Sequence, residues 1–466
     1  MQPEAVVPTV QCIAKQGTET QNPLCWDWVE TSVWTKRMLA ALGNGVKGGK
    51  WFSLIDKVYA RSTLEAAWKQ VASNKGAAGI DQVSIKRFKA CKDNYLQELE
   101  KDLQKGRYRP DLIRRVYIPK GKGQTRPLGI PTVKDRVVQA ALKIVLEPIF
   151  EREFLPVSFG FRPGLGCKNA LRRVNYFLKK GYTWVVDADL KSYFDSIPHE
   201  QLLERVKEKI SDGRVISLVE SFLKQDVMED MERWSPTAGT PQGAVLSPLL
   251  ANLYLHPFDA MMTESGHRIV RYADDFVIFC RSKAEAEATL TEVQRWTKAN
   301  GLTLHPDKTY VGNCLEKEKG FEFLGYRFEA GHRYVRKKSL TALRDKIRQR
   351  TKRTRGTSVE KIIEGLNPSL KGWFEYFKHA RFSTFRGVDG FIRRRLRAVL
   401  RKQIKHPGQG NALNDKLRWP NAYFAKRGLF TMNEAWIAAR QSRWETADWR
   451  AVCGRTACTV RRAGRV

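Results

Sequence analysis

Residues 268–280 read RIVRYADDFVIFC, two runs of apolar, β-forming residues on either side of an Asp-Asp pair. This pattern predicts two strands joined by a tight turn that contains Asp274 and Asp275. Another apolar strand is predicted for WVVDADL at residues 184–190, and its carboxyl end carries Asp189. A carboxylate at the end of an apolar strand is costly unless a cation meets it. If the strands are neighbours in one sheet, three carboxylates converge on one small volume.

Three converging carboxylates point to a divalent cation, because without one they repel each other. Mg²⁺ suits such a site, since it takes a few carboxylates and fills its other positions with water and phosphate oxygens. Two Mg²⁺ ions, or Mn²⁺ in their place, would promote in-line attack by a 3′-hydroxyl on the phosphate of an incoming nucleotide. A solvated hairpin turn is the alternative interpretation of the Asp-Asp pair by itself.

The charge of the whole chain points to a polyanionic partner. The 466 residues include 83 Lys or Arg against 49 Asp or Glu, a formal net charge of +34. Like charge at this density is usually neutralised by nucleic acid, although a basic membrane-surface protein or a merely soluble cationic protein would also fit. With 42% hydrophobic residues the chain is expected to fold, into two to four domains.

The excess of positive charge is concentrated towards the end of the chain. Residues 333–405 hold 23 Lys or Arg and 5 Asp or Glu, with aromatic residues at helical spacing among them. No run of about eighteen apolar residues and no secretory leader is evident, and the eight cysteines form no compact framework. We therefore expect reduced thiols in a cytosolic setting and a protein that is neither secreted nor membrane-spanning.

Two further segments are predicted from local pattern. Residues 114–131 alternate around the glycine-bearing turn GKGQT and predict a hairpin with a basic tip. Residues 24–42, LCWDWVETSVWTKRMLAAL, predict an amphipathic helix.

Seven motifs occur in a fixed order along the chain. They are IPKGKGQTRPLGIP (118–131), SFGFRPGLGC (158–167), DADLKSYFDSI (187–197), GTPQGAVLSPLLANLYL (239–255), YADD (272–275), LTLHPDKT (302–309) and FLGY (323–326). In this order the chain resembles the bacterial group II intron reverse transcriptases with a maturase domain, from about residue 50 to 440. The resemblance implies an α/β (α+β) right-hand polymerase, with an antiparallel sheet in the fingers and palm, a helical thumb and a helical maturase extension.

The resemblance also implies a domain order and a function. The domains are an N-terminal extension (1–50), fingers and palm (51–330), a thumb with the maturase-specific RNA-binding domain (331–410) and a basic C-terminal extension (411–466). The function is RNA-directed DNA polymerase, with intron RNA bound as a maturase to promote splicing and with retrohoming by target-primed reverse transcription. The partners would be intron RNA, an RNA template with a DNA primer, target DNA and dNTPs, with no membrane partner. The resemblance further implies a cytoplasmic bacterial protein that is associated with the nucleoid when it is on target DNA.

Matched positions receive roles from the resemblance. The metal carboxylates would be Asp189, Asp274 and Asp275, with the backbone carbonyl of Leu190 as a further ligand. Asp187 can share the strand face of Asp189 because side chains alternate, so the choice between them rests on the family pattern.

Five further positions would bind the nucleotide. Lys120 and Arg126 would hold the triphosphate by charge-assisted contacts. The ring of Phe194 would lie under the sugar and exclude a 2′-hydroxyl, Gln242 would contact the nucleotide, and Lys308 would protonate or offset the pyrophosphate. Each role has a structural alternative. Lys120 and Arg126 could belong to a solvated basic turn, and Phe194 could be an ordinary core residue. Gln242 could simply lie at a helix start, and Lys308 could be an exposed surface lysine.

The basic tail is the expected RNA-binding element. Trp373, Tyr376 and Phe377 either stack on unpaired bases or form the helix core, and their spacing favours the core. The RNA-binding candidates are the arginines expected on the opposite helix face: Arg393, Arg394, Arg395, Arg397 and Arg401.

The end of the chain departs from fuller family members, which carry a nuclease with paired Cys-x-x-Cys motifs and a His-Asn-His core. Only Cys453 and Cys458 lie near the end, and no histidine follows His406. We therefore expect no endonuclease domain, so that mobility would need a pre-existing primer. Rival interpretations are a retron or phage-defence reverse transcriptase, a CRISPR-fused enzyme, and a splicing factor with a decayed polymerase site.

Overall fold

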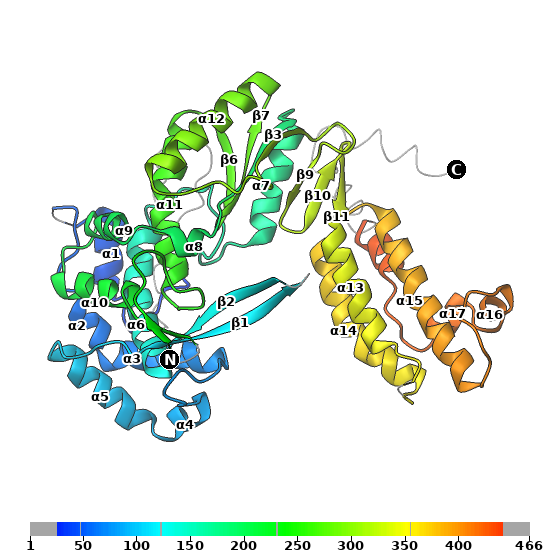
Figure 1. The fold of residues 1–466 in the computed structure, drawn as a ribbon, viewed down its shortest axis with the longest axis horizontal. Coiled ribbons are helices and arrows are strands. Elements are labelled where there is room, and N and C mark those ends of the chain that lie inside the picture. The colour runs from blue at the N-terminus through cyan, green and yellow to red at the C-terminus, as the bar shows by residue number, and fades with distance from the viewer. Residues whose placement is uncertain (1–25, 47, 122–123, 230–231, 355, 441–466) are drawn as a thin grey trace, which may run out of the picture. The chain divides into compact units, whose positions relative to one another are not determined.

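The structure is a computed structural model, and the chain forms two compact units, Met1–Val311 and Gly312–Val466, which are described separately (Figure 1). The described residues are 26–46, 48–121, 124–229, 232–354 and 356–440.

The first unit contains a central sheet with the strand order β6-β7-β3-β8. Its strands are β3 (Trp184–Asp189), β6 (Arg268–Tyr272), β7 (Asp275–Cys280) and β8 (Tyr310–Asn313), and the first unit ends within β8. β7 pairs antiparallel with both β6 and β3, so the two strands predicted around the Asp-Asp turn are confirmed. The apolar residues of β3 and β7 are buried, as expected for strands covered on both faces.

Helices cover both faces of the central sheet, because its strand side chains alternate in direction. On one face Phe276 of β7 packs against Phe258, whose ring also contacts Trp296 (centroids 5.0 Å apart in both pairs). On the other face Phe279 packs against Phe177 at 5.4 Å. These rings come from α11 (Ser247–Glu264), α12 (Lys283–Ala299) and α7 (Cys167–Lys179).

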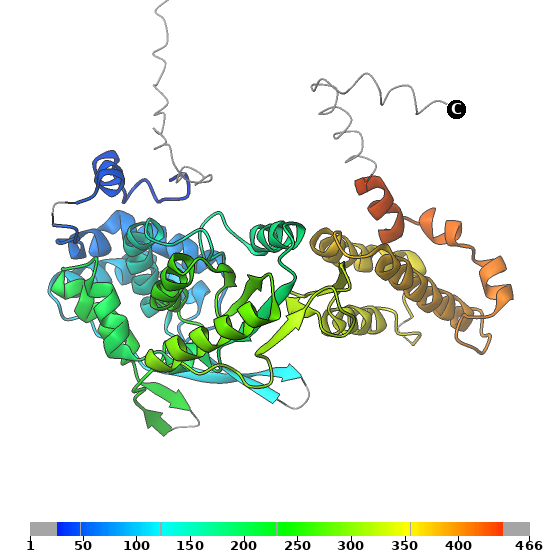
Figure 2. The ribbon, with the colours of Figure 1, turned by 90° about the horizontal axis from the view of Figure 1, so that it is seen from above.

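A second sheet in this unit has the order β2-β1-β4-β5. Its strands are β1 (Ile113–Gly121), β2 (Gln124–Ile130), β4 (Val227–Glu229) and β5 (Glu232–Trp234). β1 and β2 form the predicted basic hairpin, which extends from the unit as a two-stranded arm (cyan in Figures 1 and 2).

Among the remaining helices of the first unit, α6 has almost all of its residues buried, and helices that precede and follow it in the chain pack against it. These remaining helices are α1 (Lys36–Asn44), α2 (Ile55–Tyr59), α3 (Arg61–Ser73), α4 (Ile85–Ala90), α5 (Lys92–Gln104), α6 (Val133–Glu151), α8 (Tyr193–Ser196), α9 (His199–Lys207) and α10 (Gly213–Leu223). The hydroxyl of Thr132 accepts a hydrogen bond from the backbone N–H of Asp135 and caps α6.

The helix expected over residues 24–42 begins only at Lys36, and the described residues before it form turns. Thr35 caps this helix through the N–H of Met38. The indole N–H of the buried Trp34 donates to the carbonyl of Ile144, 2.9 Å away. The helix prediction is confirmed for residues 36–42 and wrong for residues 26–35, because burial of Trp34 and the Thr35 cap set the start of the helix.

The second unit contains a small sheet and a bundle of helices. Its strands, in the order β11-β10-β9, are β9 (Phe321–Phe323), β10 (Tyr326–Glu329) and β11 (His332–Val335). Its helices are α13 (Lys337–Arg350), α14 (Val359–Phe377), α15 (Phe382–Gln403), α16 (Leu413–Arg418) and α17 (Asn421–Ala425). α13, α14 and α15 pack on each other, with apolar residues such as Leu370, Phe374 and Phe385 between them.

The boundary between the units lies after Val311, earlier than the boundary expected at residue 330. The hydroxyl of Tyr326 in β10 donates to the carbonyl of Tyr376 in α14, and the Tyr376 hydroxyl donates to the carbonyl of Leu324. These reciprocal bonds attach FLGY to the helices that follow it. The motif therefore belongs structurally to the second unit.

Of the tail aromatics, Phe377 is buried and Trp373 and Tyr376 are half-buried, in agreement with the core interpretation. Cys453 and Cys458 lie outside the described residues. None of the helices in the described part of the chain is both long and apolar enough to cross a lipid bilayer.

Candidate active site

An acidic pair lies at one end of the central sheet. Asp189, the last residue of β3, is the register partner of Asp275, the first residue of β7. Opposed residues on antiparallel strands project to the same face with Cβ atoms about 5 Å apart. Asp274 precedes Asp275 in the turn between β6 and β7. The fold thus places two remote carboxylates side by side, with a third next to them in the chain.

The Asp-Asp turn is held from behind by a buried ion pair. Arg271 and Asp259 are both almost fully buried and form a salt bridge between β6 and α11. The same guanidinium donates to the carbonyl of Ala273 at 2.9 Å and to the side-chain oxygen of Asn252 at 3.1 Å. Ala273 has a φ of +60°, as primed hairpin turns require. These contacts of Arg271 therefore fix the position and orientation of the Asp-Asp turn.

Gly160 of the SFGFRPGLGC loop completes this support. Its carbonyl accepts a hydrogen bond from the Asn252 amide at 2.7 Å. A Cβ at Gly160 would lie 2.4 Å from the backbone nitrogen of Ala273, so only glycine allows the loop to approach the turn this closely.

The carboxylates are met by cations from elsewhere in the unit. Lys308 forms an ion pair with Asp189, and the N–H of His305 donates to the carbonyl of Asp189 at 2.8 Å. Burial raises the pKa of Asp274, and repulsion from Asp189 raises it further, whereas Arg126 and Lys308 act to lower it. The site is therefore an electrostatically costly acidic centre that positive charge stabilises.

Arg126 and Gln242 are joined in a chain of hydrogen bonds. Arg126 of β2 donates to the side-chain oxygen of Gln242 at 2.7 Å, and the amide of Gln242 donates to Asp195 at 2.9 Å. The guanidinium of Arg126 is exposed. Lys120 lies in β1, but its side chain is outside the described part of the structure.

The PQG turn is tightly fitted to the hairpin arm. The N–H of Gly129 donates to the carbonyl of Gln242 at 2.7 Å. Gly243 has a φ of +108°, and a Cβ there would lie 2.6 Å from the carbonyl oxygen of Gly129. A side chain at Gly243 would push this turn away from β2.

Phe194 lies in α8, next to Asp195, and is half-buried. Its ring is edge-on to Phe161 at 6.4 Å and to Tyr193 at 5.7 Å. Phe161 is 46% exposed and has a φ of +59°, an unusual conformation for a bulky residue. The two rings form an aromatic pair close to the residues that bind Gln242.

Leu190 follows β3 directly, and its backbone orientation follows from the hydrogen bonds of its neighbours. Leu190 and Leu304 form an isolated antiparallel β-bridge. The hydrogen bonds on either side of this bridge are made by the neighbours of Leu190: the N–H of Lys191 donates to the carbonyl of Thr303, and the carbonyl of Asp189 accepts from the N–H of His305. Backbone groups of successive strand residues face opposite sides, so the Leu190 carbonyl faces the β7 side. Asp187 shares the face of Asp189 but is 7% exposed within the sheet.

The donor set at this site suits a divalent cation. Asp189 and Asp275, with Asp274 beside them, offer carboxylate oxygens, the type of donor that hard cations prefer. In the described residues no group of three or more His, Cys, Asp or Glu is arranged as a metal-binding cluster, and the ammonium of Lys308 lies on Asp189. The carboxylates nevertheless fit the metal, because their mutual repulsion is what a bound cation would relieve.

The sequence interpretation missed the supporting residues. Arg271 was a detectable signal, since an arginine in an apolar strand requires a buried acidic partner. The partner itself, Asp259, and the roles of Asn252 and Asp195 had no local signal, because they depend on which helices meet the sheet.

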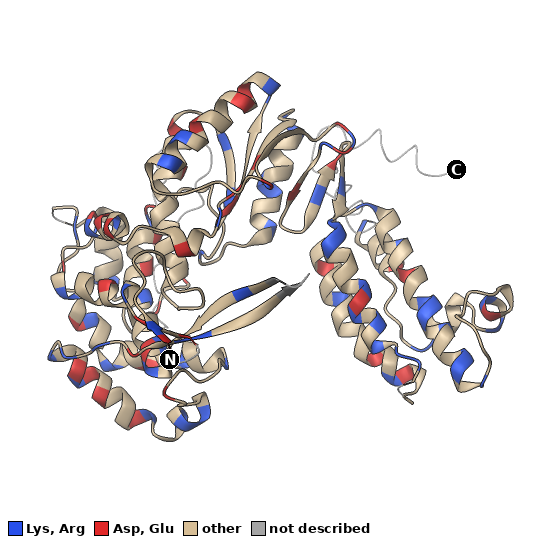
Figure 3. Cartoon of the chain, viewed as in Figure 1, with Lys and Arg blue, Asp and Glu red and all other residues tan. Residues whose placement is uncertain are grey.

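The five arginines predicted to bind RNA lie on α15 in the second unit, and three of them contact neighbouring protein groups. Arg395 donates to the hydroxyl and carbonyl of Thr351, Arg397 is buried and donates to the carbonyl of Trp419, and Arg401 pairs with Asp415. Arg393 and Arg394 line a cavity, described below. Figure 3 shows Lys and Arg at repeated positions along α13 and α15.

Comparisons with known proteins agree with this architecture. Residues 118–328 match the family described as "Reverse transcriptase (RNA-dependent DNA polymerase)", and residues 340–419 match "Group II intron, maturase-specific domain". Protein YkfC of Escherichia coli (strain K12) is 35% identical over 317 residues, 59% of this chain and 81% of the relative. The group II intron-encoded protein LtrA of Lactococcus lactis subsp. cremoris is 39% identical over 201 residues, 42% of this chain and 33% of the relative.

Among solved structures, a chain of a partial Cas6-RT-Cas1–Cas2 complex is 27% identical with a TM-score of 0.35, covering 53% of this chain and 41% of that chain. The alignment with LtrA spans about a third of that protein.

A sheet end with paired aspartates, a basic hairpin arm and a helical basic unit defines the right-hand class of nucleotidyl polymerase. The chain belongs to the group II intron reverse transcriptase and maturase family. Membership implies RNA-directed DNA polymerase activity with dependence on a divalent metal, and binding of nucleic acid.

Proposed function

We propose that this chain extends a DNA primer on an RNA template from dNTPs with Mg²⁺, and binds its intron RNA to promote splicing and retrohoming. The observation that carries the polymerase proposal is the register pairing of Asp189 with Asp275, with Lys308 and Arg126 as the positive groups around them. The alternative of a solvated hairpin turn does not explain why Asp274 and Asp275 lie beside a second acidic strand end and near two cations from remote segments.

Each residue at the site has a distinct role in this proposal. Asp189, Asp274 and Asp275, with the Leu190 carbonyl, would hold Mg²⁺. Bound Mg²⁺ neutralises charge on the phosphate under attack. Lys308, which forms an ion pair with Asp189, would protonate the departing pyrophosphate or offset its charge.

The nucleotide would be bound by residues around the PQG turn. Arg126 is exposed and held in place by Gln242, so it can offer its remaining N–H groups to the triphosphate. Gln242 is itself oriented by Asp195, which prevents it from turning away. Such preorganisation is what an active site needs to act on developing charge.

Removal of divalent metal tests the proposal directly. We expect the protein to extend a DNA primer on an RNA template with Mg²⁺ and dNTPs, to lose this activity in excess EDTA, and to regain it when Mg²⁺ is restored. Primer extension is measured on a denaturing gel. Absence of extension under all Mg²⁺ and Mn²⁺ concentrations would favour the rival splicing factor without a working polymerase.

Replacement of Phe194 tests its proposed place under the sugar. We expect Phe194→Ala to raise incorporation of ribonucleotides relative to dNTPs by about tenfold or more, because the ring that would clash with a 2′-hydroxyl is removed. The measurement is the ratio of kcat/KM for rGTP and dGTP. Phe194→Tyr, which keeps the ring, is the control, and an unchanged ratio in Phe194→Ala would place the ring elsewhere.

A further inference from the structure

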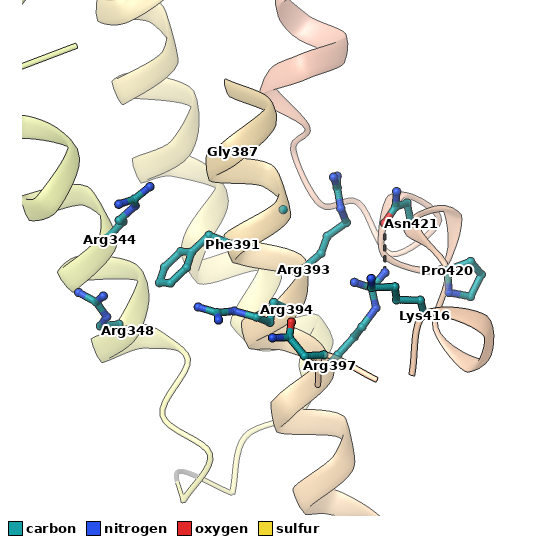
Figure 4. Close-up of a pocket in the computed structure, with 12 residues that line it drawn as sticks. Arg344, Arg348, Gly387, Phe391, Arg393, Arg394, Arg397, Lys416, Pro420 and Asn421 are labelled. Carbon is teal, nitrogen blue, oxygen red and sulfur yellow. Dashed lines mark hydrogen bonds between the residues drawn. The ribbon is translucent and has the colours of Figure 1, made fainter. Parts of the chain in front are cut away.

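The second unit contains a cationic cavity of about 780 Å³ between α13, α15 and the segments around α16 and α17 (Figure 4). Six Lys or Arg side chains line it: Arg344, Arg348, Arg393, Arg394, Arg397 and Lys416. None of the described lining residues is acidic. A concave surface with this charge attracts an anion.

An aromatic ring lies among the guanidinium groups. The guanidinium carbons of Arg394, Arg348 and Arg344 lie 5.4, 5.5 and 6.0 Å from the ring centroid of Phe391. The Nε of Arg344 is buried and has no hydrogen-bond partner in the described part of the chain. Arg348 has a surface ion pair with Asp345, which lies outside the lining. The cluster combines like charges with unused hydrogen-bonding capacity.

Two glycines make room in front of the ring. Gly387 and Gly390 lie in the interior of α15, and a Cβ at either position would meet no atom within 4 Å. With Phe391 and Arg394 they form one stripe at i, i+3, i+4 and i+7 on this helix. A glycine in a helix interior costs about 1 kcal/mol relative to alanine, and no packing contact requires it here. The glycines leave helix backbone open to the cavity.

One side of the cavity is formed by a side chain that is hydrogen-bonded to neighbouring protein groups. Arg397 is buried and donates to the carbonyl of Trp419 at 2.9 Å and to the side chain of Asn421 at 3.1 Å. Its guanidinium therefore joins α15 to α17 and serves as a wall, and Figure 4 shows this bond to Asn421. The residues available for a ligand are those around Phe391.

We propose that this cavity seats one unpaired nucleotide of RNA. The base lies against Phe391 in the space left by Gly387 and Gly390, and the flanking phosphates contact Arg344, Arg348 and Arg394. Stacking on an aromatic ring beside cations is the usual recognition of an unstacked base. Duplex RNA is a poorer fit, because its bases stay paired and its phosphates lie on a convex surface. The inference rests on the proposed function, since it assumes that this unit binds RNA.

Filling the cavity tests the inference without disturbing its charges. We expect Gly390→Leu to weaken binding of a short single-stranded RNA by about tenfold, the effect of losing one stacked base. Gly372→Leu is the matched control, because Gly372 is an exposed helix-interior glycine in α14 with open space around it and lies outside the cavity lining. Both substitutions raise helix propensity, so loss of folding is not expected.

Two further measurements locate the nucleotide. Single-stranded RNA that contains 5-iodouridine should crosslink to the α15 segment at Phe391, and Gly390→Leu should abolish this crosslink. Phe391→Leu should weaken single-stranded RNA binding several-fold while leaving the slope of log Kd against log salt unchanged. Arg344→Gln with Arg394→Gln should lower that slope by about one to two.

Three outcomes distinguish this inference from the proposed function. If Gly390→Leu binds single-stranded RNA as the wild type and Gly372→Leu do, the inference is overturned and the proposed function stands. If Gly390→Leu weakens binding of duplex RNA as much as binding of single-stranded RNA, the cavity contacts only phosphates, and the proposal that it holds an unpaired nucleotide is overturned. If the wild type binds no RNA, both fail. All binding is measured with the full chain, and primer extension by the control Gly372→Leu should equal that of the wild type.

Discussion

Asp274→Asn is expected to lower primer extension by about a thousandfold or more, because a neutral amide cannot replace the carboxylate that, in the proposed function, holds the metal. The substitution keeps the size of the side chain and removes only its charge. The measurement is single-turnover incorporation of one dNTP on an RNA template. Asp93→Asn, an exposed carboxylate of the same unit outside the site, is the control and should retain wild-type rates.

The same substitution should not destabilise the metal-free protein. Burial and repulsion from Asp189 raise the pKa of Asp274, so its charged form is unfavourable in the folded state without metal. We therefore expect Asp274→Asn to unfold, in EDTA, at the same temperature as the wild type or at a higher one. Loss of activity together with a lower unfolding temperature would indicate a structural carboxylate and would contradict a catalytic one. An unfavourable buried charge that lowers stability is tolerated at a functional site, because the activity depends on it.

Arg271→Met is expected to lower the free energy of unfolding by about 3–5 kcal/mol, since it leaves the buried carboxylate of Asp259 without its partner. Urea unfolding followed by circular dichroism measures the change. Primer extension should fall as well, because the carbonyl of Ala273 loses the donor that fixes the Asp-Asp turn.

A double substitution separates these two effects. In Arg271→Met with Asp259→Leu no buried charge is left unpaired, so most of the lost stability should return. The activity should stay low, because the Ala273 carbonyl still lacks its donor. Recovery of both stability and activity would show that Arg271 supports the fold alone. A cost below about 1 kcal/mol for Arg271→Met would contradict the buried ion pair altogether.

Much of the first unit follows from local pattern. The runs RIVR and FVIFC form β6 and β7 around the turn, and IPKGKGQTRPLGIP contributes to the hairpin arm. These elements are predictable because strand alternation and turn residues act over a few neighbours. The helix expected over residues 24–42 was wrong for residues 26–35 because Trp34 reaches a carbonyl in α6, a partner that local periodicity does not encode.

The candidate site was predictable in its residue types and only partly in its contacts. Motif order singled out Asp189, Asp274 and Asp275, and the structure pairs Asp189 with Asp275 by register. The series of hydrogen bonds from Arg126 through Gln242 to Asp195 could not be predicted, because it joins three segments that are separate in the sequence. Similarly, helical spacing on α15 did not distinguish arginines that bind neighbouring protein groups from those that line the cavity.

The sequence by itself determined the strands, their acidic ends, the basic hairpin and the concentration of positive charge after residue 333, because these depend on residue type and short-range spacing. Only the tertiary structure decided that Lys308 lies on Asp189, that Arg271 fixes the turn through Ala273, and that two helix glycines open a cavity beside Phe391. The reason is physical: desolvation, ion pairing and free volume are set by groups remote in the chain that packing brings together.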